Sequence, residues 1–104
     1  MAEYSEIKTE LLPTLNRFGI TQVKEDLNPD YYGSSYSIFS GHGLTYKISW
    51  HGQDGCGYIH YKDNDNWVEL EVSAPEAKAS DFKNTIMQMR IALAEHIALK
   101  KLKV

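Results

Sequence analysis

Residues 46–72 read YKISWHGQDGCGYIHYKDNDNWVELEV, and they contain two turn sequences, GQDG and DNDN, between segments in which apolar and polar side chains alternate. Such alternation is typical of strands with one buried face. Side chains point alternately to the two faces of a sheet, so a slip of one residue in strand pairing moves every apolar side chain to the other face. The pattern therefore predicts how these strands pair as well as where they lie.

The turn Gly52–Gly55 defines the first hairpin. We expect His51 to pair with Cys56 across it, because this pairing keeps the apolar side chains on one face. A slip of one residue would mix polar side chains into that face. The chosen pairing sets large apolar residues opposite one another, Ile48 with Ile59 and Tyr46 with Tyr61. Trp50 joins the same face.

The turn Asp63–Asn66 defines the second hairpin, and we expect Lys62 to pair with Trp67 across it. The remaining pairs follow: Tyr61 with Val68, His60 with Glu69, Ile59 with Leu70, and Gly57 with Val72. The two hairpins are paired independently, yet they agree on which face is apolar. This agreement between two separate predictions is evidence for the sheet.

The strand that precedes these hairpins is predicted from the turn Gly41–Gly43. A three-residue loop with its last glycine in the left-handed conformation is a common hairpin connection. That loop would add Tyr36 and Ile38 to the apolar face and leave Phe39 on the polar face.

Residues 3–18 carry apolar side chains at helical spacing, namely Tyr4, Ile7, Leu11, Leu15 and Phe18. Gly19 follows as a C-cap. Pro13 lies inside the pattern, so we expect either a kinked helix or two short helices. Residues 20–30 then read as a first strand or as an irregular return, and Asn28-Pro29-Asp30 is a turn signal.

A C-terminal helix is predicted over residues 80–102, with Ser80 as its N-cap. One apolar stripe should cover the sheet: Phe82, Ile86, Met89, Leu93 and Ile97. A second stripe lies about 140° around the helix at 100° per residue. It consists of Met87, Ile91, Ala94, Ala98 and Leu102. We expect this second stripe to be buried, either by the N-terminal helix near Leu12 or by a second copy in a homodimer, which we favour.

These elements predict a single α+β domain over residues 1–104. It has two layers: an antiparallel β-meander of four strands, or five if residues 20–30 form one, and an N-terminal and a C-terminal helix packed on one face of the sheet. A chain of this length suits one domain with one core.

The composition argues against several functional classes. The net charge is −3 and the eleven basic residues are dispersed, which argues against nucleic acid, because phosphate backbones require clustered cations. No run approaches the roughly 20 apolar residues of a membrane span. A single cysteine excludes an internal disulfide, and no signal peptide is visible, so a cytoplasmic location is expected.

The polar face of the predicted sheet is the candidate functional surface. We expect Ser37, Lys47, His60 and Glu69 to form one row across it, and Lys62 to lie along the Trp67 ring. A mixture of aromatic and charged side chains is typical of recognition surfaces. The expected partner-binding residues are Tyr58, Trp67, Lys62, His60, Glu69, Lys47 and Phe39.

Cys56 beside His51 is the sharpest candidate for chemistry, because a cysteine next to a histidine can form a thiolate–imidazolium pair. Asp54 in the turn could orient the histidine. His42, His51 and His60 are spaced by nine residues, which matches no familiar zinc pattern, so no metal is expected. No segment has a cofactor-binding motif, and no cofactor is expected.

The absence of such motifs favours a small protein-binding module that docks on a larger protein, plausibly as an inhibitor of the immunity or anti-defence type. The partner would be another protein. A first alternative is a thiol-dependent enzyme that uses Cys56 and His51. A second is a structural subunit that dimerises through the C-terminal helix.

Overall fold

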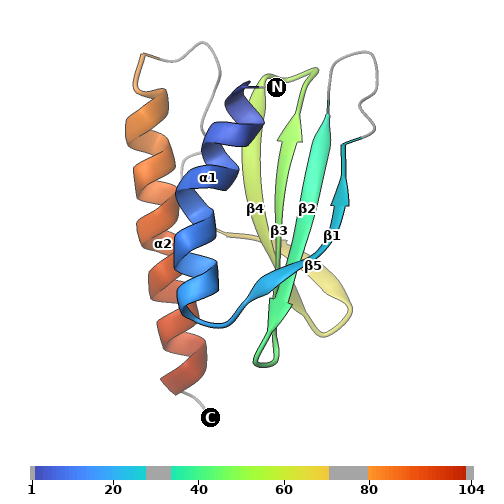
Figure 1. The fold of residues 1–104 in the computed structure, drawn as a ribbon, viewed down its shortest axis with the longest axis vertical. Coiled ribbons are helices and arrows are strands. Elements are labelled where there is room, and N and C mark those ends of the chain that lie inside the picture. Colours follow the sequence, from blue (N-terminus) through green and yellow to red (C-terminus); the bar gives the residue numbers. More distant parts are fainter. Residues whose placement is uncertain (1, 28–33, 71–79, 103–104) are drawn as a thin grey trace.

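A computed structural model describes residues 2–27, 34–70 and 80–102 of the chain. The elements, in chain order, are α1 (Ala2–Arg17), β1 (Thr21–Asp26), β2 (Ser35–Gly41), β3 (Leu44–His51), β4 (Cys56–Asp63), β5 (Asn66–Glu69) and α2 (Phe82–Leu102). The strands pair in the order β1-β2-β3-β4-β5, each antiparallel to the next. Both helices lie on the same face of the sheet (Figure 1). The predicted α+β fold is therefore confirmed.

Residues 21–26 form the fifth strand, so the first of the two alternatives for this segment is correct. β1 is an edge strand, and its pairing with β2 is interrupted by a bulge between Gln22 and Lys24. Bulges of this kind twist an edge and discourage pairing with another sheet. The predicted turn Asn28-Pro29-Asp30 lies outside the described residues.

The predicted pairing of β3 with β4 and of β4 with β5 is confirmed. The observed pairs include His51 with Cys56, Ile48 with Ile59, Tyr46 with Tyr61, Lys62 with Trp67, Tyr61 with Val68 and His60 with Glu69. Leu70 follows β5, and its N–H donates to the carbonyl of Ile59 at 2.9 Å. The expected pair of Gly57 with Val72 lies outside the described residues.

The predicted pairing of β2 with β3 is wrong by one residue. Gly41 pairs with Leu44, so the turn contains only His42 and Gly43, which have φ angles of 52° and 79°. Two left-handed residues in succession are the mark of a type I′ turn, a common two-residue connection whose twist matches that of the flanking strands. The slip turns every side chain of β2 to the opposite face.

This slip corrects the placement of three residues. Phe39 is not on the polar face: it lies opposite Tyr46 with an exposed fraction of 0%. Tyr36 and Ile38, which were expected in the core, lie on the face away from the helices. The observed register buries Phe39 together with Ser35 and Ser37, so the turn, rather than the amount of apolar surface in β2, determines the pairing.

The core lies between the sheet and the two helices. α1 contributes Tyr4, Ile7, Leu11 and Leu15, and α2 contributes Ile86, Met89, Leu93 and Ile97. The sheet contributes Phe39, Tyr46, Ile48, Trp50 and Ile59, and Leu70 extends the core past the end of β5. The stripe predicted to cover the sheet is therefore confirmed; Phe82, at its start, packs edge-on against Trp50 with 6.5 Å between ring centroids.

The ends of the helices follow their capping residues. α1 runs through Pro13 as one helix and ends at a Schellman motif, in which Gly19 has a φ of 75° and the Ile20 N–H donates to the Leu15 carbonyl at 2.9 Å. α2 begins later than predicted. Asp81, not Ser80, holds the cap position, since its carbonyl accepts the Thr85 N–H at 2.9 Å.

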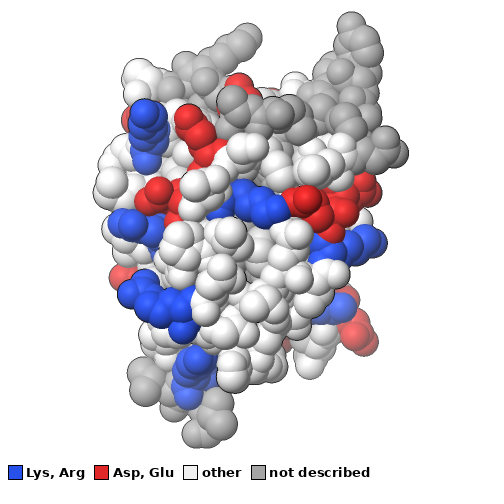
Figure 2. Space-filling model, in the orientation of Figure 1, with Lys and Arg blue, Asp and Glu red and all other residues white. Residues whose placement is uncertain are grey.

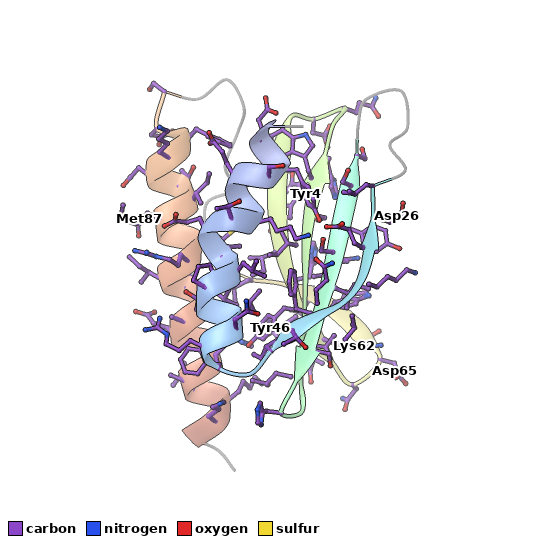
Figure 3. The ribbon with its side chains drawn as sticks, viewed as in Figure 1. Tyr4, Asp26, Tyr46, Lys62, Asp65 and Met87 are labelled. Atoms are coloured by element: carbon purple, nitrogen blue, oxygen red, sulfur yellow. The ribbon has the colours of Figure 1, made fainter. Side chains whose placement is uncertain are left out.

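A polar network links α1 to the sheet. The hydroxyls of Tyr4 and Ser37 form a hydrogen bond in the buried layer, and Ser37 donates to a Glu25 carboxylate oxygen at 3.2 Å. Lys8 on α1 pairs with the same carboxylate, and this hydrogen bond lowers the pKa of Glu25. Figure 3 shows Tyr4 beside the sheet. The slip in β2 makes the network possible, because it turns Ser37 toward the helices.

The second stripe of α2 is only partly covered. α1 lies beside α2, and Arg90 pairs with Glu10 between them at 3.3 Å, yet Met87 is 45% exposed and Ile91 is 43% exposed. Figure 3 shows Met87 on the outer side of α2. Ala98 is exposed as well, so the expectation that α1 alone buries this stripe is wrong for these three residues. The side chain of Leu102 lies outside the description.

The helix-bearing side of the molecule carries charges of both signs, interspersed rather than segregated (Figure 2). Neither described helix combines the length and the apolar character that crossing a membrane requires.

Candidate functional site

The helices leave one face of the sheet uncovered, which we call the open face. The strand pairing and the alternation of burial assign its side chains: Lys24 and Asp26 from β1; Tyr36, Ile38 and Ser40 from β2; Thr45, Lys47, Ser49 and His51 from β3; Cys56, Tyr58, His60 and Lys62 from β4; Trp67 and Glu69 from β5. Figure 3 shows the difference between the two faces, with Tyr46 between sheet and helices and Lys62 beyond the sheet.

Lysines and aromatic rings alternate across the open face. The Lys24 ammonium lies 5.6 Å from the centroid of the Tyr36 ring. The Lys47 ammonium lies 5.9 Å from Tyr36 and 4.8 Å from Trp67, so it is shared by the two rings. Lys62 completes the series at 5.6 Å from Trp67, which confirms the predicted contact. We call Lys24, Tyr36, Lys47, Trp67 and Lys62 the lysine–aromatic ladder.

The ladder orders side chains that would otherwise be mobile. Each cation–π contact at an exposed position contributes about 0.5–1 kcal/mol. Together the contacts span the sheet from β1 to β5 and hold both rings in place. A rigid aromatic surface of this kind loses little conformational entropy when a partner binds.

A pocket of about 440 Å³ opens on the same face, and we call it the sheet pocket. It is lined by Asp26, Ser34, Ser35, Tyr36, Lys47, Ser49, Trp50, His51 and His60. Within the described chain, three buried side-chain polar atoms lack a hydrogen-bond partner: Ser35 Oγ, Ser49 Oγ and His60 Nδ1. All three belong to residues that line this pocket. Buried polar atoms are nearly always paired, so their convergence here requires an explanation.

His60 lies between Lys47 and Glu69 in the strand pairing, as predicted. Burial lowers the pKa of His60, the nearby Lys47 ammonium lowers it further, and Glu69 partly opposes this change. The imidazole is therefore neutral at pH 7. A neutral imidazole has one donor and one acceptor nitrogen, so it can serve either kind of ligand group.

His51 and Cys56 are cross-strand partners, as predicted, but their contacts do not resemble an activated nucleophile. The Cys56 thiol donates to the backbone carbonyl of Asp54 at 3.4 Å. The His51 ring packs against Tyr58 with 4.6 Å between centroids. Nucleophilic catalysis needs a thiolate, and neither of these contacts is a charged partner that would stabilise one. The geometry therefore adds no support to the thiol-enzyme hypothesis.

The contacts of the other two histidines, His42 and His96, indicate roles in the packing of the fold. His42 lies in the turn between β2 and β3, and its ring packs over Gly19. His96 on α2 forms a hydrogen bond of 2.7 Å between its Nδ1 and the buried Tyr46 hydroxyl. Across the described ranges, no three His, Cys, Asp or Glu side chains are grouped so that they could hold a metal ion.

The sequence pattern missed Lys24, Tyr36 and Ile38 as open-face residues, and with them two of the five members of the lysine–aromatic ladder. Tyr36 and Ile38 were misplaced because of the length of a single turn, and Lys24 lies in residues 20–30, for which a strand and an irregular return were both left open. The dipeptide His42-Gly43 carried the signal, because glycine is the preferred second residue of a two-residue hairpin turn. Phe39 opposite Tyr46 was the second signal.

Comparisons with known proteins give no relative for this chain. No family model matches it, and no match is found among curated proteins or among solved structures. Its function is therefore inferred from the residues of the open face.

Proposed function

We propose that this protein is a protein-binding module that docks a partner on the open face of its sheet. The lysine–aromatic ladder carries this proposal. Tryptophan and tyrosine are enriched among the residues that dominate binding energy, because they bury a large area with few rotatable bonds. Here Trp67 and Tyr36 are held by lysines on a five-stranded scaffold, and Tyr58 lies in the same cross-strand row as Tyr36.

The charge of the open face indicates the kind of partner. The chain as a whole carries a net charge of −3. The ladder nevertheless gathers Lys24, Lys47 and Lys62 on one face, against Asp26 and Glu69. Complementary charges favour encounter and orient the partners. A partner with an acidic patch fits this face best, and a small inhibitor of a larger protein is the role most compatible with the size of the chain.

Affinity capture with substituted proteins tests this proposal. Wild-type protein, Trp67→Ala and Tyr36→Ala are immobilised, and the proteins retained from the native host are compared. A partner of the open face should be retained by wild type and lost from both variants, since truncating a binding hot spot costs at least about 2 kcal/mol. Lys83→Met on α2 is the control, because Lys83 is exposed on the helix side.

The proposal fails if a partner is retained equally by wild type and by folded Trp67→Ala and Tyr36→Ala. Circular dichroism and thermal unfolding establish that the variants are folded. Loss of the same partner from Lys83→Met but not from the ladder variants would instead place the interface on the helices.

A second candidate role is supported by the exposed part of the second stripe. Met87 and Ile91 lie next to open grooves between α1 and α2, lined in part by Glu10 and Arg90. An apolar patch on a helix is a common dimerisation surface. This role is compatible with the first, because the stripe and the open face lie on different sides of the molecule.

A further inference from the structure

Ser49 is the starting point, because its side chain is buried without a hydrogen-bond partner. Its exposed fraction is 6%, and its Oγ has no partner within the described chain. Ser49 stands on the open face, with Tyr36 and Tyr58 as its cross-strand neighbours, and it lines the sheet pocket. A hydroxyl that is shielded from water and unpaired destabilises the free protein. A ligand that forms a hydrogen bond with it removes this cost, and the affinity for the ligand rises accordingly.

His60 supplies a second unpaired atom in the same pocket. Its Nδ1 is buried and has no partner among the described residues. His60 belongs to the next strand pair on the same face, two positions along from the pair of Ser49 and Tyr58. The third unpaired atom, Ser35 Oγ, belongs to a residue whose register position is on the helix face. Ser49 and His60 therefore form the polar floor of the pocket.

Lys47 determines the sign of the charge that a ligand of this pocket should carry. Its side chain lines the pocket, and its strand partner is His60. An ammonium, a hydroxyl and an imidazole N–H can all donate hydrogen bonds to the same acceptor. A metal cation would meet the ammonium at close range. An anionic oxygen group is therefore the complementary ligand.

Asp26 limits the charge of that ligand, because it lines the same pocket. A dianion such as a phosphate would be repelled by its carboxylate more strongly than a monoanion. The balance of one lysine against one aspartate thus favours a single carboxylate.

We propose that the sheet pocket binds one carboxylate, the Asp or Glu side chain of a partner protein, with Ser49 Oγ and His60 Nδ1 donating hydrogen bonds and Lys47 supplying the opposite charge. That the carboxylate belongs to a partner protein rests on the proposed function. That the pocket binds a carboxylate does not. The lysine–aromatic ladder would then supply contact area beside a specific polar anchor.

Nitrogen-15 NMR of the histidine rings tests the pocket without any partner. The full-length protein is titrated with sodium acetate, and in parallel with inorganic phosphate, at constant ionic strength with sodium chloride. Acetate should shift the His60 ring signals in a saturable manner and raise the pKa of His60, because a bound anion stabilises the imidazolium. The signals of His96, which lies on α2 on the other side of the sheet, should not follow the same curve.

Substitutions identify the residues that bind. Ser49→Ala and Lys47→Met should each weaken acetate binding by about fivefold or more, the effect of losing one hydrogen bond or ion pair to a charged group. Lys83→Met is the matched control and should bind acetate as wild type does. Ser49→Ala should unfold at the same or a higher temperature, because it removes a buried hydroxyl that has no partner among the residues that the structure describes.

Three results would overturn the proposal. One is the absence of a saturable His60 shift up to about 100 mM acetate, well above the millimolar range of weak single-site binding. Another is tighter binding of phosphate than of acetate, which would assign the pocket to a phosphorylated ligand. The third is a partner captured through Trp67 whose affinity is unchanged by Ser49→Ala and Lys47→Met. That last outcome would leave the proposed function intact, whereas acetate binding with no partner captured through Trp67 would remove the proposed function alone.

Discussion

At the scale of single residues, the close approach of Gly41 to the end of α1 shows how little space the fold leaves. A Cβ at Gly41 would lie 2.2 Å from the Gly19 carbonyl oxygen. That oxygen belongs to the backbone, so the clash cannot be relieved by rotating a side chain. Glycine at position 41 allows the chain that enters β1 to pass against the end of β2.

Gly41→Ala should therefore destabilise the protein by about 1–3 kcal/mol, the usual cost of forcing extra atoms into a packed site. Urea unfolding followed by circular dichroism measures the change. Gly43→Ala is the matched control. No atom lies within 4 Å of a Cβ there, and only its φ of 79° opposes the substitution. We expect the control to lose less, and a Gly41→Ala protein as stable as Gly43→Ala would contradict the close contact.

The buried pair of Tyr46 and His96 makes stability depend on pH. The Tyr46 hydroxyl and His96 Nδ1 form a hydrogen bond of 2.7 Å between sheet and helix. Burial lowers the pKa of His96, and the nearby Lys100 lowers it further. In the unfolded chain the pKa of a histidine is about 6.5. Between the lowered pKa and this value the unfolded state binds more protons, so acidification favours unfolding.

The free energy of unfolding should accordingly be highest above about pH 6.5 and decrease as the pH falls toward the folded-state pKa of His96. Urea denaturation from pH 7.5 to pH 5 measures this decrease. His96→Gln should flatten the curve in this window, and His60→Gln should do so partly, because the pKa of His60 is also lowered by burial. His42→Asn, in the exposed turn, is the control. An unchanged slope in His96→Gln would contradict the coupling.

At the scale of elements, the β2–β3 hairpin has a register that the alternation of apolar residues could not predict. Helix and strand positions follow from periodicity, and two of the hairpins pair as the alternation of apolar residues requires. In β2 the sequence Ser-Tyr-Ser-Ile-Phe offers large side chains in both registers, so periodicity does not choose between them. The length of the turn determines the register instead. A turn shorter by one residue moves the side chains of β2 that were expected in the core to the open face, and the others to the core.

The corrected pairing predicts unequal effects for two neighbouring residues. Phe39→Ala should cost about 3–5 kcal/mol, as expected for a large buried side chain. Ile38→Ala, on the open face, should cost clearly less, because Ile38 is only partly buried. Both are measured by urea denaturation. The three-residue turn would predict the reverse order, so the comparison decides between the two registers directly.

The candidate site could be predicted only in part, and for a related reason. Lys62 against Trp67 and the row of Lys47, His60 and Glu69 follow from pairing alone. The sheet pocket does not, because it depends on Asp26 and Tyr36, which come from strands that were left open or misregistered. Unpaired buried atoms such as Ser49 Oγ are also invisible in a sequence, since they depend on which neighbours fail to reach them.

At the scale of the whole molecule, the two sides of the fold present different surfaces. The open face combines a lysine–aromatic ladder with a polar pocket. The helix side carries mixed charges (Figure 2) and an apolar stripe that α1 covers incompletely. A protein with two such surfaces can bind a partner through one and a second copy of itself through the other.

The last prediction is that the second stripe makes the protein a dimer. Met87 and Ile91 are 45% and 43% exposed, whereas Ala94, further along the stripe, is half-buried and small enough to let another helix approach closely. Two-fold symmetry would pack each stripe on its own copy. Light scattering at low micromolar concentration should give a dimer for wild type and folded monomers for Ile91→Glu, because a buried unpaired carboxylate opposes association. Val23→Glu, at an exposed apolar residue on the edge strand β1, should remain dimeric. A wild-type monomer would show that Met87 and Ile91 remain in contact with water, and that the stripe is not an interface between copies.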